Sequence, residues 1–354
     1  MKQTGFLSNM AKREFIPDMT LDLTACGSRA LIISDLHMGS GKRDDLTDNG
    51  ELLISLLEDY YFPQGWHLVL NGDIEELQRY SLDRIKEKWK RLYGVFDLFA
   101  GQNRLYKLIG NHDDELLLNK SYPYPLYGVI RVETGLIPAY VFHGHQSSRI
   151  YSKYNKILRA GIRYVLKPVG IKNTSSGRSP YKRFHVEKAA YDFSLNMRCI
   201  SIIGHTHRPL FESLGRLEYI KFEIERLIRD YPASSGEKRC FIETNVMALR
   251  RELGKLKKKE RRDTRHNVYG DEMPVPCLFN SGCAIGKKGL HAIELSCEDI
   301  ALVYWYTEGK GRRFISRGGY DIEKIGDNRR AILNRDRLDF IFARIQLLGS
   351  TINK

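Results

Sequence analysis

Five short apolar segments, each followed directly by histidine, aspartate or asparagine, constrain the fold of this chain more than any other feature. The clearest is residues 201–203, which run into Gly204-His205-Thr206-His207. Apolar runs of this length are typical of buried strands, and a glycine lets the backbone turn sharply where a strand ends. The other four segments end in these groups: Asp35-Leu36-His37, Gly72-Asp73, Gly110-Asn111-His112-Asp113 and His143-Gly144-His145. Core packing does not explain five strand ends that all carry oxygen or imidazole ligands.

Strand-like and helix-like segments alternate in the first third of the chain. Apolar runs predict strands at 30–33, 66–70 and 105–109, and helical spacing predicts helices after Asp48 and over 81–99. This alternation indicates a largely parallel sheet with covered faces. Further strands are predicted at 129–132, 140–142 and 277–279, an antiparallel hairpin at 291–295 and 300–306, and helices at 219–228 and 241–256.

The length and charge of the chain limit its organisation and its partners. We expect 354 residues to form a single domain over 1–354, interrupted by two basic helical insertions at about 148–195 and 211–272. The formal net charge of +14 favours anionic partners, which could be phosphorylated substrates, nucleic acid or an acidic membrane surface.

The cysteines and the hydropathy pattern suggest a cytoplasmic protein. None of the six cysteines forms a Cys-x-x-Cys pair, which argues against a thiolate zinc site and favours a reduced compartment. No apolar run approaches the roughly 18 residues that read as a spanning helix. We expect a cytoplasmic location, with peripheral contact at the inner face of the membrane as an open alternative.

The residues at the strand ends form a mixed oxygen and nitrogen ligand set for two neighbouring cations. Asp73 can bridge two ions with its two carboxylate oxygens, and Asn111 supplies a neutral amide oxygen. The remaining candidate ligands are Asp35, His37, His143, His205 and His207. Such a set suits two divalent transition metals, Mn, Fe or Zn, better than calcium. Paired metals of this kind polarise a phosphoryl group and activate water.

His112 and Asp113 are the candidate catalytic pair. His112 follows the candidate ligand Asn111 and could protonate a leaving oxygen, while Asp113 could orient its ring. Glu76 is interpreted as a structural residue that could hold a ligand through a hydrogen bond.

In order and composition, these motifs resemble the calcineurin-like metallophosphoesterase family. The resemblance rests on Asp35-x-His37, Gly72-Asp73-x-x-Glu76, Gly110-Asn111-His112-Asp113, His143 and Gly204-His205-x-His207. It implies an α/β fold in which a two-sheet sandwich is flanked by helices and carries the metals at its strand ends. It also implies one metal on Asp35, His37, Asp73 and His207, and another on Asp73, Asn111, His143 and His205. His112 matches the catalytic histidine of the family.

Departures from the family pattern bear on the substrate. The segment Glu75-Glu76-Leu77-Gln78 stands where protein phosphatases of the family carry Asp-Arg-Gly, which argues against phosphoprotein. The basic insertion after His145 is similar to the helical lid of UDP-2,3-diacylglucosamine hydrolases. We therefore expect a phosphorylated small-molecule or lipid-linked substrate. The candidate substrate contacts are His145, Arg149, Arg159 and Arg163.

Three functional classes follow from this sequence. The first is a dinuclear metal-dependent phosphoesterase that hydrolyses a phosphomonoester, a phosphodiester or a diphosphate. The second is a metal-dependent nuclease, which the positive charge permits. The third is a non-catalytic module that binds metal or phosphate, against which the complete ligand set and His112 both argue.

Overall fold

The computed structural model describes most of the chain. The described residues are 17–41, 44–145, 180–211, 220, 224, 227–228, 231–263, 275–285, 288–310, 315 and 320–349. The chain divides into two compact units, of which the first comprises residues 1–212 and 275–354 and the second residues 213–274. Both sheets and all the candidate site residues within the described ranges belong to the first unit.

The larger sheet has eight strands in the order β12-β13-β11-β10-β2-β3-β4-β5. Its strands are β2 (Arg29–Ile33), β3 (His67–Asn71), β4 (Leu105–Leu108), β5 (Leu126–Tyr127), β10 (Leu290–Ser296), β11 (Asp299–Thr307), β12 (Asp321–Ile325) and β13 (Asn328–Arg337). Strands β2 to β5 are parallel, so their carboxyl ends meet at one edge. Strands β10 to β13 extend the sheet with antiparallel pairings.

The smaller sheet has five strands in the order β1-β6-β7-β8-β9. Its strands are β1 (Met19–Asp22), β6 (Val129–Glu133), β7 (Ala139–Phe142), β8 (Ile200–Ile203) and β9 (Leu278–Asn280). The last three run parallel and are buried along their whole length. Buried parallel strands of this kind read as continuous apolar runs, which is why the sequence identifies them.

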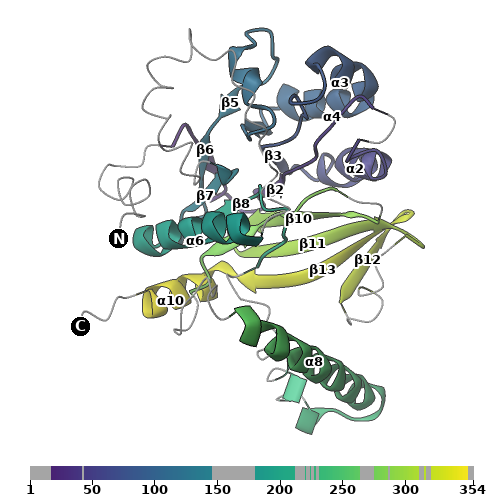
Figure 1. The fold of residues 1–354 in the computed structure, drawn as a ribbon, viewed down its shortest axis with the longest axis vertical. Helices are drawn as coiled ribbons and strands as arrows, with labels where there is room; N and C mark the ends of the chain where they lie inside the picture. The colour runs from purple at the N-terminus through teal and green to yellow at the C-terminus, as the bar shows by residue number, and fades with distance from the viewer. Residues whose placement is uncertain are drawn as a thin grey trace. The chain divides into compact units, whose positions relative to one another are not determined.

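Helices flank both sheets of the first unit, so the expected two-sheet α/β architecture is confirmed (Figure 1). The helices are α2 (Gly50–Ser55), its π-helical continuation η1 (Leu56–Tyr61), α3 (Leu82–Lys88), α4 (Lys90–Gly101), the 3₁₀ turn η2 (Asp114–Leu118), α6 (Pro180–Met197) and α10 (Leu338–Leu348). Helix α4 packs on β4, and α6 packs on β8 and β9. In the second unit lie η5 (Tyr231–Ala233) and α8 (Gly236–Asp263).

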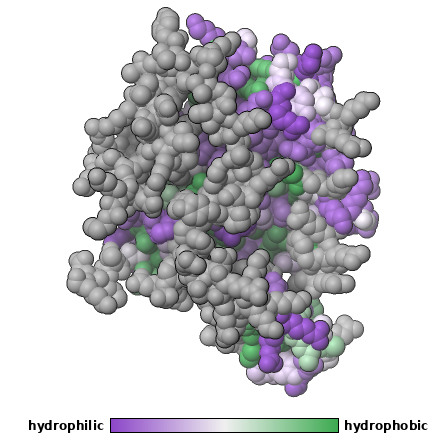
Figure 2. Space-filling model, viewed as in Figure 1, coloured by the Kyte–Doolittle hydropathy of each residue, from purple (hydrophilic) through white to green (hydrophobic). Residues whose placement is uncertain are grey.

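A large apolar core lies between helices α2 to α4 and the eight-stranded sheet. Phe96 and Phe99 of α4 are fully buried there together with Leu53 of α2, Leu70 of β3 and Trp305 of β11. The surface of this part is mainly hydrophilic where the space-filling view shows it in colour (Figure 2). The amphipathic spacing of the helices therefore fixes which face they bury.

One helix differs from the sequence-based prediction. The single helix predicted over 81–99 is divided at Trp89, whose φ of −100° and ψ of 25° are not helical. The indole of Trp89 donates a hydrogen bond to the carbonyl oxygen of Gly39, which holds the break in place.

None of the helices in the described ranges combines the length and apolar character needed to cross a bilayer.

Candidate metal centre

The candidate ligands converge where the parallel strands of both sheets end. Asp35, Asp73 and Asn111 follow β2, β3 and β4, while His143 and His205 follow β7 and β8. The two sheets are joined at this place by Asn71. The side-chain amide of Asn71 donates to the carbonyl oxygen of Phe142 at 3.2 Å. The backbone carbonyl oxygen of Asn71 accepts from His143 Nδ1 at 2.8 Å.

Asp35, His37 and His207 form one cluster, which we call the accessible half-site. The Nε2 atom of His207 lies 3.1 Å from Asp35 Oδ1 and 3.3 Å from His37 Nε2. The side chain of His207 is 22% exposed, whereas those of its two neighbours are almost completely buried. This cluster can be reached from solvent.

Asp73, His143 and His205 form a second cluster, which we call the buried half-site. Their ligand atoms lie within 4.8 Å of one another, and all three residues are buried. Asp73 Oδ2 lies 3.1 Å from His143 Nε2 and 3.9 Å from His37 Nε2. Asp73 therefore stands between the two half-sites, where a bridging carboxylate is expected.

Five of the candidate ligands adopt a left-handed backbone conformation. They are Asp35, His37, Asp73, His205 and His207, with φ between 48° and 64°. This conformation costs a residue with a Cβ atom roughly 1–2 kcal/mol. Of the described non-glycine residues only Asn103 and Arg198 share it elsewhere. Strain concentrated in this way is characteristic of functional sites.

Two glycines allow the loops to approach one another. Gly72 has a φ of 78°, and a Cβ atom there would lie 2.6 Å from His143 Nδ1. A Cβ atom on Gly110 would collide with the Asp73 carboxylate. Without these glycines, Asp73 could not occupy its position between the half-sites.

Glu76 holds two histidines at once. Its Oε2 atom lies 3.1 Å from His37 Nδ1, and its Oε1 atom lies 2.9 Å from His112 Nδ1. If the imidazoles donate these bonds, the Nε2 atom of His37 is left for a metal and that of His112 for a proton. The backbone N–H of His112 also donates to Asp73 Oδ1 at 2.8 Å.

The structure corrects the expectation that Asp113 orients His112. Both oxygens of the Asp113 carboxylate are used elsewhere, on the backbone N–H groups of Ile74 and Gly110 and on the Lys107 ammonium group at 2.5 Å. Glu76 holds the His112 ring instead. Asp113 therefore ties together the loops that carry Asp73 and Asn111.

Lys107 is a fully buried cation beneath these loops. Its ammonium group lies 3.1 Å from Glu75 Oε2 as well as 2.5 Å from Asp113 Oδ2. Burial works against the charged form, but the two carboxylates raise the pKa of Lys107 above its ordinary value. The hydroxyls of Tyr93 and Tyr122 donate to Glu75, so this ion cluster is also hydrogen-bonded.

The charges of the cluster fit a site for cations. Burial opposes ionisation of Asp73, but the His143 imidazole holds the pKa of this carboxyl well below its usual range. Burial also works against protonation of His143 and His37, yet nearby carboxylates, led by Asp73 for His143 and Glu76 for His37, raise both pKa values to about 9. Burial and His143 lower the pKa of His205 to about 3. The positive charges of protonated His37 and His143 thus balance the carboxylates, and metal cations could supply this positive charge instead.

The side-chain oxygen of Asn111 gives an independent indication of a cation site. Its side-chain oxygen is buried and accepts no hydrogen bond from the described residues. An unsatisfied buried acceptor costs about 1–3 kcal/mol. A cation beside the buried half-site would satisfy this oxygen, as the sequence-based assignment of Asn111 requires.

Several supporting residues were not identified as such from the sequence. The side chain of Asn280 donates to the carbonyl oxygen of Gly204 and to Thr206 Oγ1, which fixes the turn between His205 and His207. Thr206 in turn donates to the buried carboxylate of Glu187 on α6. In the sequence, the only signal for these contacts is a polar residue, Asn280, at the end of the apolar segment that forms β9.

The expected substrate contacts are only partly within the described chain. His145 is buried beside the buried half-site, with its ring centroid 5.4 Å from that of His143. Burial and the adjacent His143 hold the pKa of His145 well below its usual range. Arg149, Arg159 and Arg163 lie outside the described residues.

Comparisons with known proteins give distant structural similarities only. No protein-family model matches the chain, and no curated protein sequence matches it. The structure is similar to a single mutant of Vps29 from Entamoeba histolytica, with 9% identity, a TM-score of 0.36 and coverage of 87% of this chain and 98% of that one. It is also similar to YfcE, a phosphoesterase from E. coli, with 13% identity, a TM-score of 0.33 and coverage of 77% and 91%. Such distant similarities carry no conclusion about activity.

Proposed function

We propose that this chain is a metal-dependent phosphoesterase. The observation that carries the proposal is the position of Asp73 between two clusters of carboxylate and imidazole groups, with His112 adjacent. Two divalent transition metals, Mn, Fe or Zn, would polarise a phosphoryl group and activate water for its hydrolysis. The residues that would hold them are Asp35, His37, Asp73, Asn111, His143, His205 and His207.

His112 is the general acid in this proposal. Its side chain is 14% exposed, so a substrate can reach it, and its Nδ1 atom is held by Glu76. A protonated imidazole in that orientation can deliver a proton from Nε2 to the leaving oxygen. Its position next to Asn111, a proposed metal ligand, supports this role, because the proton would then be close to the phosphate.

We expect the substrate to be a phosphomonoester, a phosphodiester or a diphosphate of a small or lipid-linked molecule. The formal net charge of +14 supports an anionic substrate but also permits nucleic acid. One panel separates these classes: a lipid-linked diphosphate, a nucleotide phosphodiester, and single-stranded and double-stranded DNA. Cleavage of DNA far above the small substrates would replace this proposal by a nuclease.

The function is tested with His112→Ala on the manganese-loaded protein. We expect the variant to keep its metal content, because His112 is not a ligand, and to lose about 10²–10⁴-fold in turnover of an aryl phosphodiester. His67→Ala is the matched control, since His67 lies on β3 outside the site. Wild-type protein without bound metal or turnover would contradict the proposed function, and full turnover in the variant would remove His112 from its role.

A further inference from the structure

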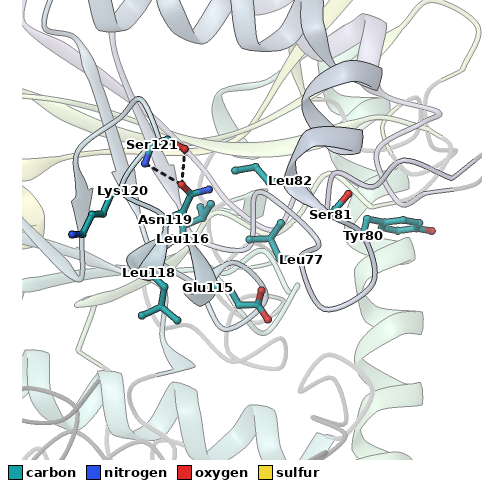
Figure 3. A pocket seen from close by; sticks show the side chains of 10 residues that line it. All are labelled: Leu77, Tyr80, Ser81, Leu82, Glu115, Leu116, Leu118, Asn119, Lys120 and Ser121. Atoms are coloured by element: carbon teal, nitrogen blue, oxygen red, sulfur yellow. Dashed lines mark hydrogen bonds between the residues drawn. The ribbon is translucent and has the colours of Figure 1, made fainter. Parts of the chain in front are cut away.

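An open hollow lies between two chain segments that directly follow loops of the candidate metal centre. Its volume is about 730 Å³, within the range of roughly 300–1,000 Å³ that is usual for ligand sites. It is lined by two chain segments, residues 77–82 and residues 115–121. Figure 3 shows that side chains from both segments surround it.

Both walls of the hollow continue the loops of the metal centre. Leu77 immediately follows Glu76, which holds His37 and His112. The backbone N–H of Leu77 donates to the carbonyl oxygen of His112 at 3.0 Å. The Gln78 side chain donates to the carbonyl oxygen of Asn111 at 2.9 Å. One wall of the hollow is therefore hydrogen-bonded to the loop that carries Asn111 and His112, and a leaving group protonated by His112 could extend along it.

The lining of the hollow includes four leucines and is balanced in charge. Leu77, Leu82, Leu116 and Leu118 all contribute to it, and Leu118 is 60% exposed. One acid, Glu115, and one base, Lys120, complete the charged lining. Leu116 is almost completely buried, so the accessible apolar surface of the hollow comes from Leu118 and from the half-buried Leu77 and Leu82. Because the two charges cancel, the lining favours an uncharged organic group over a polyanion.

We propose that this hollow binds the apolar organic group of a phosphoester substrate, on its leaving-group side. The inference rests on the proposed function, because the candidate metal centre would hold the phosphate. It identifies the substrate as the ester of an aryl or alkyl alcohol, and Leu118 as a residue that determines specificity.

The test compares the binding of two non-hydrolysable probes, methylphosphonate and octylphosphonate, to the manganese-loaded protein by calorimetry. Burying even two methylene groups strengthens binding by roughly tenfold. We therefore expect octylphosphonate to bind at least about tenfold more tightly. Leu118→Ser should reduce that preference severalfold and leave the affinity for methylphosphonate unchanged.

Leu98→Ser is the matched control, since Leu98 is an exposed leucine of α4 that does not line the hollow. It should retain the preference of the wild-type protein. Equal binding of the two probes, or an unchanged preference in Leu118→Ser, would overturn the inference and leave the phosphoesterase proposal intact. Failure of both probes to bind would instead point to failure of the metal centre itself.

Discussion

The accessible and the buried half-sites use similar ligands in different surroundings. In the accessible half-site, solvent reaches His207, and Glu76 holds His37 from behind. In the buried half-site, His143 is held by a backbone carbonyl oxygen and has no solvent exposure. In the proposed function, substrate and water would approach from the accessible side. The buried half-site is the one that depends on the surrounding fold for its geometry.

The half-sites differ in support as well as in exposure. Lys107 and Asp113 connect the loops of Asp73 and Asn111, which are both candidate ligands of the buried half-site. The accessible half-site instead depends on Glu76, which also holds the candidate acid His112. Each arrangement can therefore be perturbed separately, and Asp73 is the residue common to both.

The largest effect is expected from Asp73→Asn, which should weaken metal binding in both half-sites. The variant keeps the shape of the side chain but loses the charge that both cations would share. We expect the metal content to fall in both half-sites and turnover to decrease by about 10³-fold or more, because metal charge stabilisation contributes several kcal/mol. Elemental analysis and aryl phosphodiester hydrolysis measure these effects.

The exposed Asp59→Asn of η1 serves as the control for that experiment. It should leave both the metal content and turnover unchanged. Loss of only one metal equivalent in Asp73→Asn would show that Asp73 belongs to a single half-site.

Lys107→Met should destabilise the protein at the loops that carry Asp73 and Asn111. Removing the ammonium group leaves the Glu75 and Asp113 carboxylates buried without their cation. We expect the free energy of unfolding to fall by about 3–5 kcal/mol, measured by urea denaturation. Arg91→Gln, which breaks ion pairs that are largely exposed, should cost no more than about 1 kcal/mol. Equal effects of the two substitutions would contradict the supporting role of Lys107.

Glu76→Gln should give the smallest of these effects and confine it to the accessible half-site. An amide keeps one hydrogen-bond acceptor but no longer offers a carboxylate oxygen to each of His112 and His37. Outer partners of metal ligands typically contribute about 10–100-fold, so we expect a loss of that size in turnover. Metal titration should show weaker binding of one equivalent only. A similar weakening of both equivalents would mean that the half-sites are not independently supported.

The sequence was sufficient to identify the strand ends and most of the polar residues that converge there. Buried parallel strands appear as apolar runs, and polar residues directly after them, such as Asp35 and His205, must lie at the sheet edge. Asp113 was interpreted wrongly because neighbours in sequence diverge in a tight loop, where its carboxylate turns towards Lys107. No sequence pattern indicates such a turn.

Other features depend on contacts between distant segments. The break at Trp89 follows from a hydrogen bond to Gly39, fifty residues earlier in the chain. The paired role of Glu76 requires both His37 and His112 to be in place. The strands β12 and β13 carry many charged residues, so they lack the continuous apolar runs that identify buried strands.

The left-handed ligands have a consequence for the folding of the metal-free chain. Five such residues together raise the free energy of the folded state by roughly 5–10 kcal/mol, which is comparable to the whole net stability of an ordinary protein. The apolar core behind α2 to α4 must offset this strain before any ion arrives. Because an ion that binds only the folded form shifts the equilibrium towards it, the supply of metal would govern how much of the chain remains folded as well as how much is active.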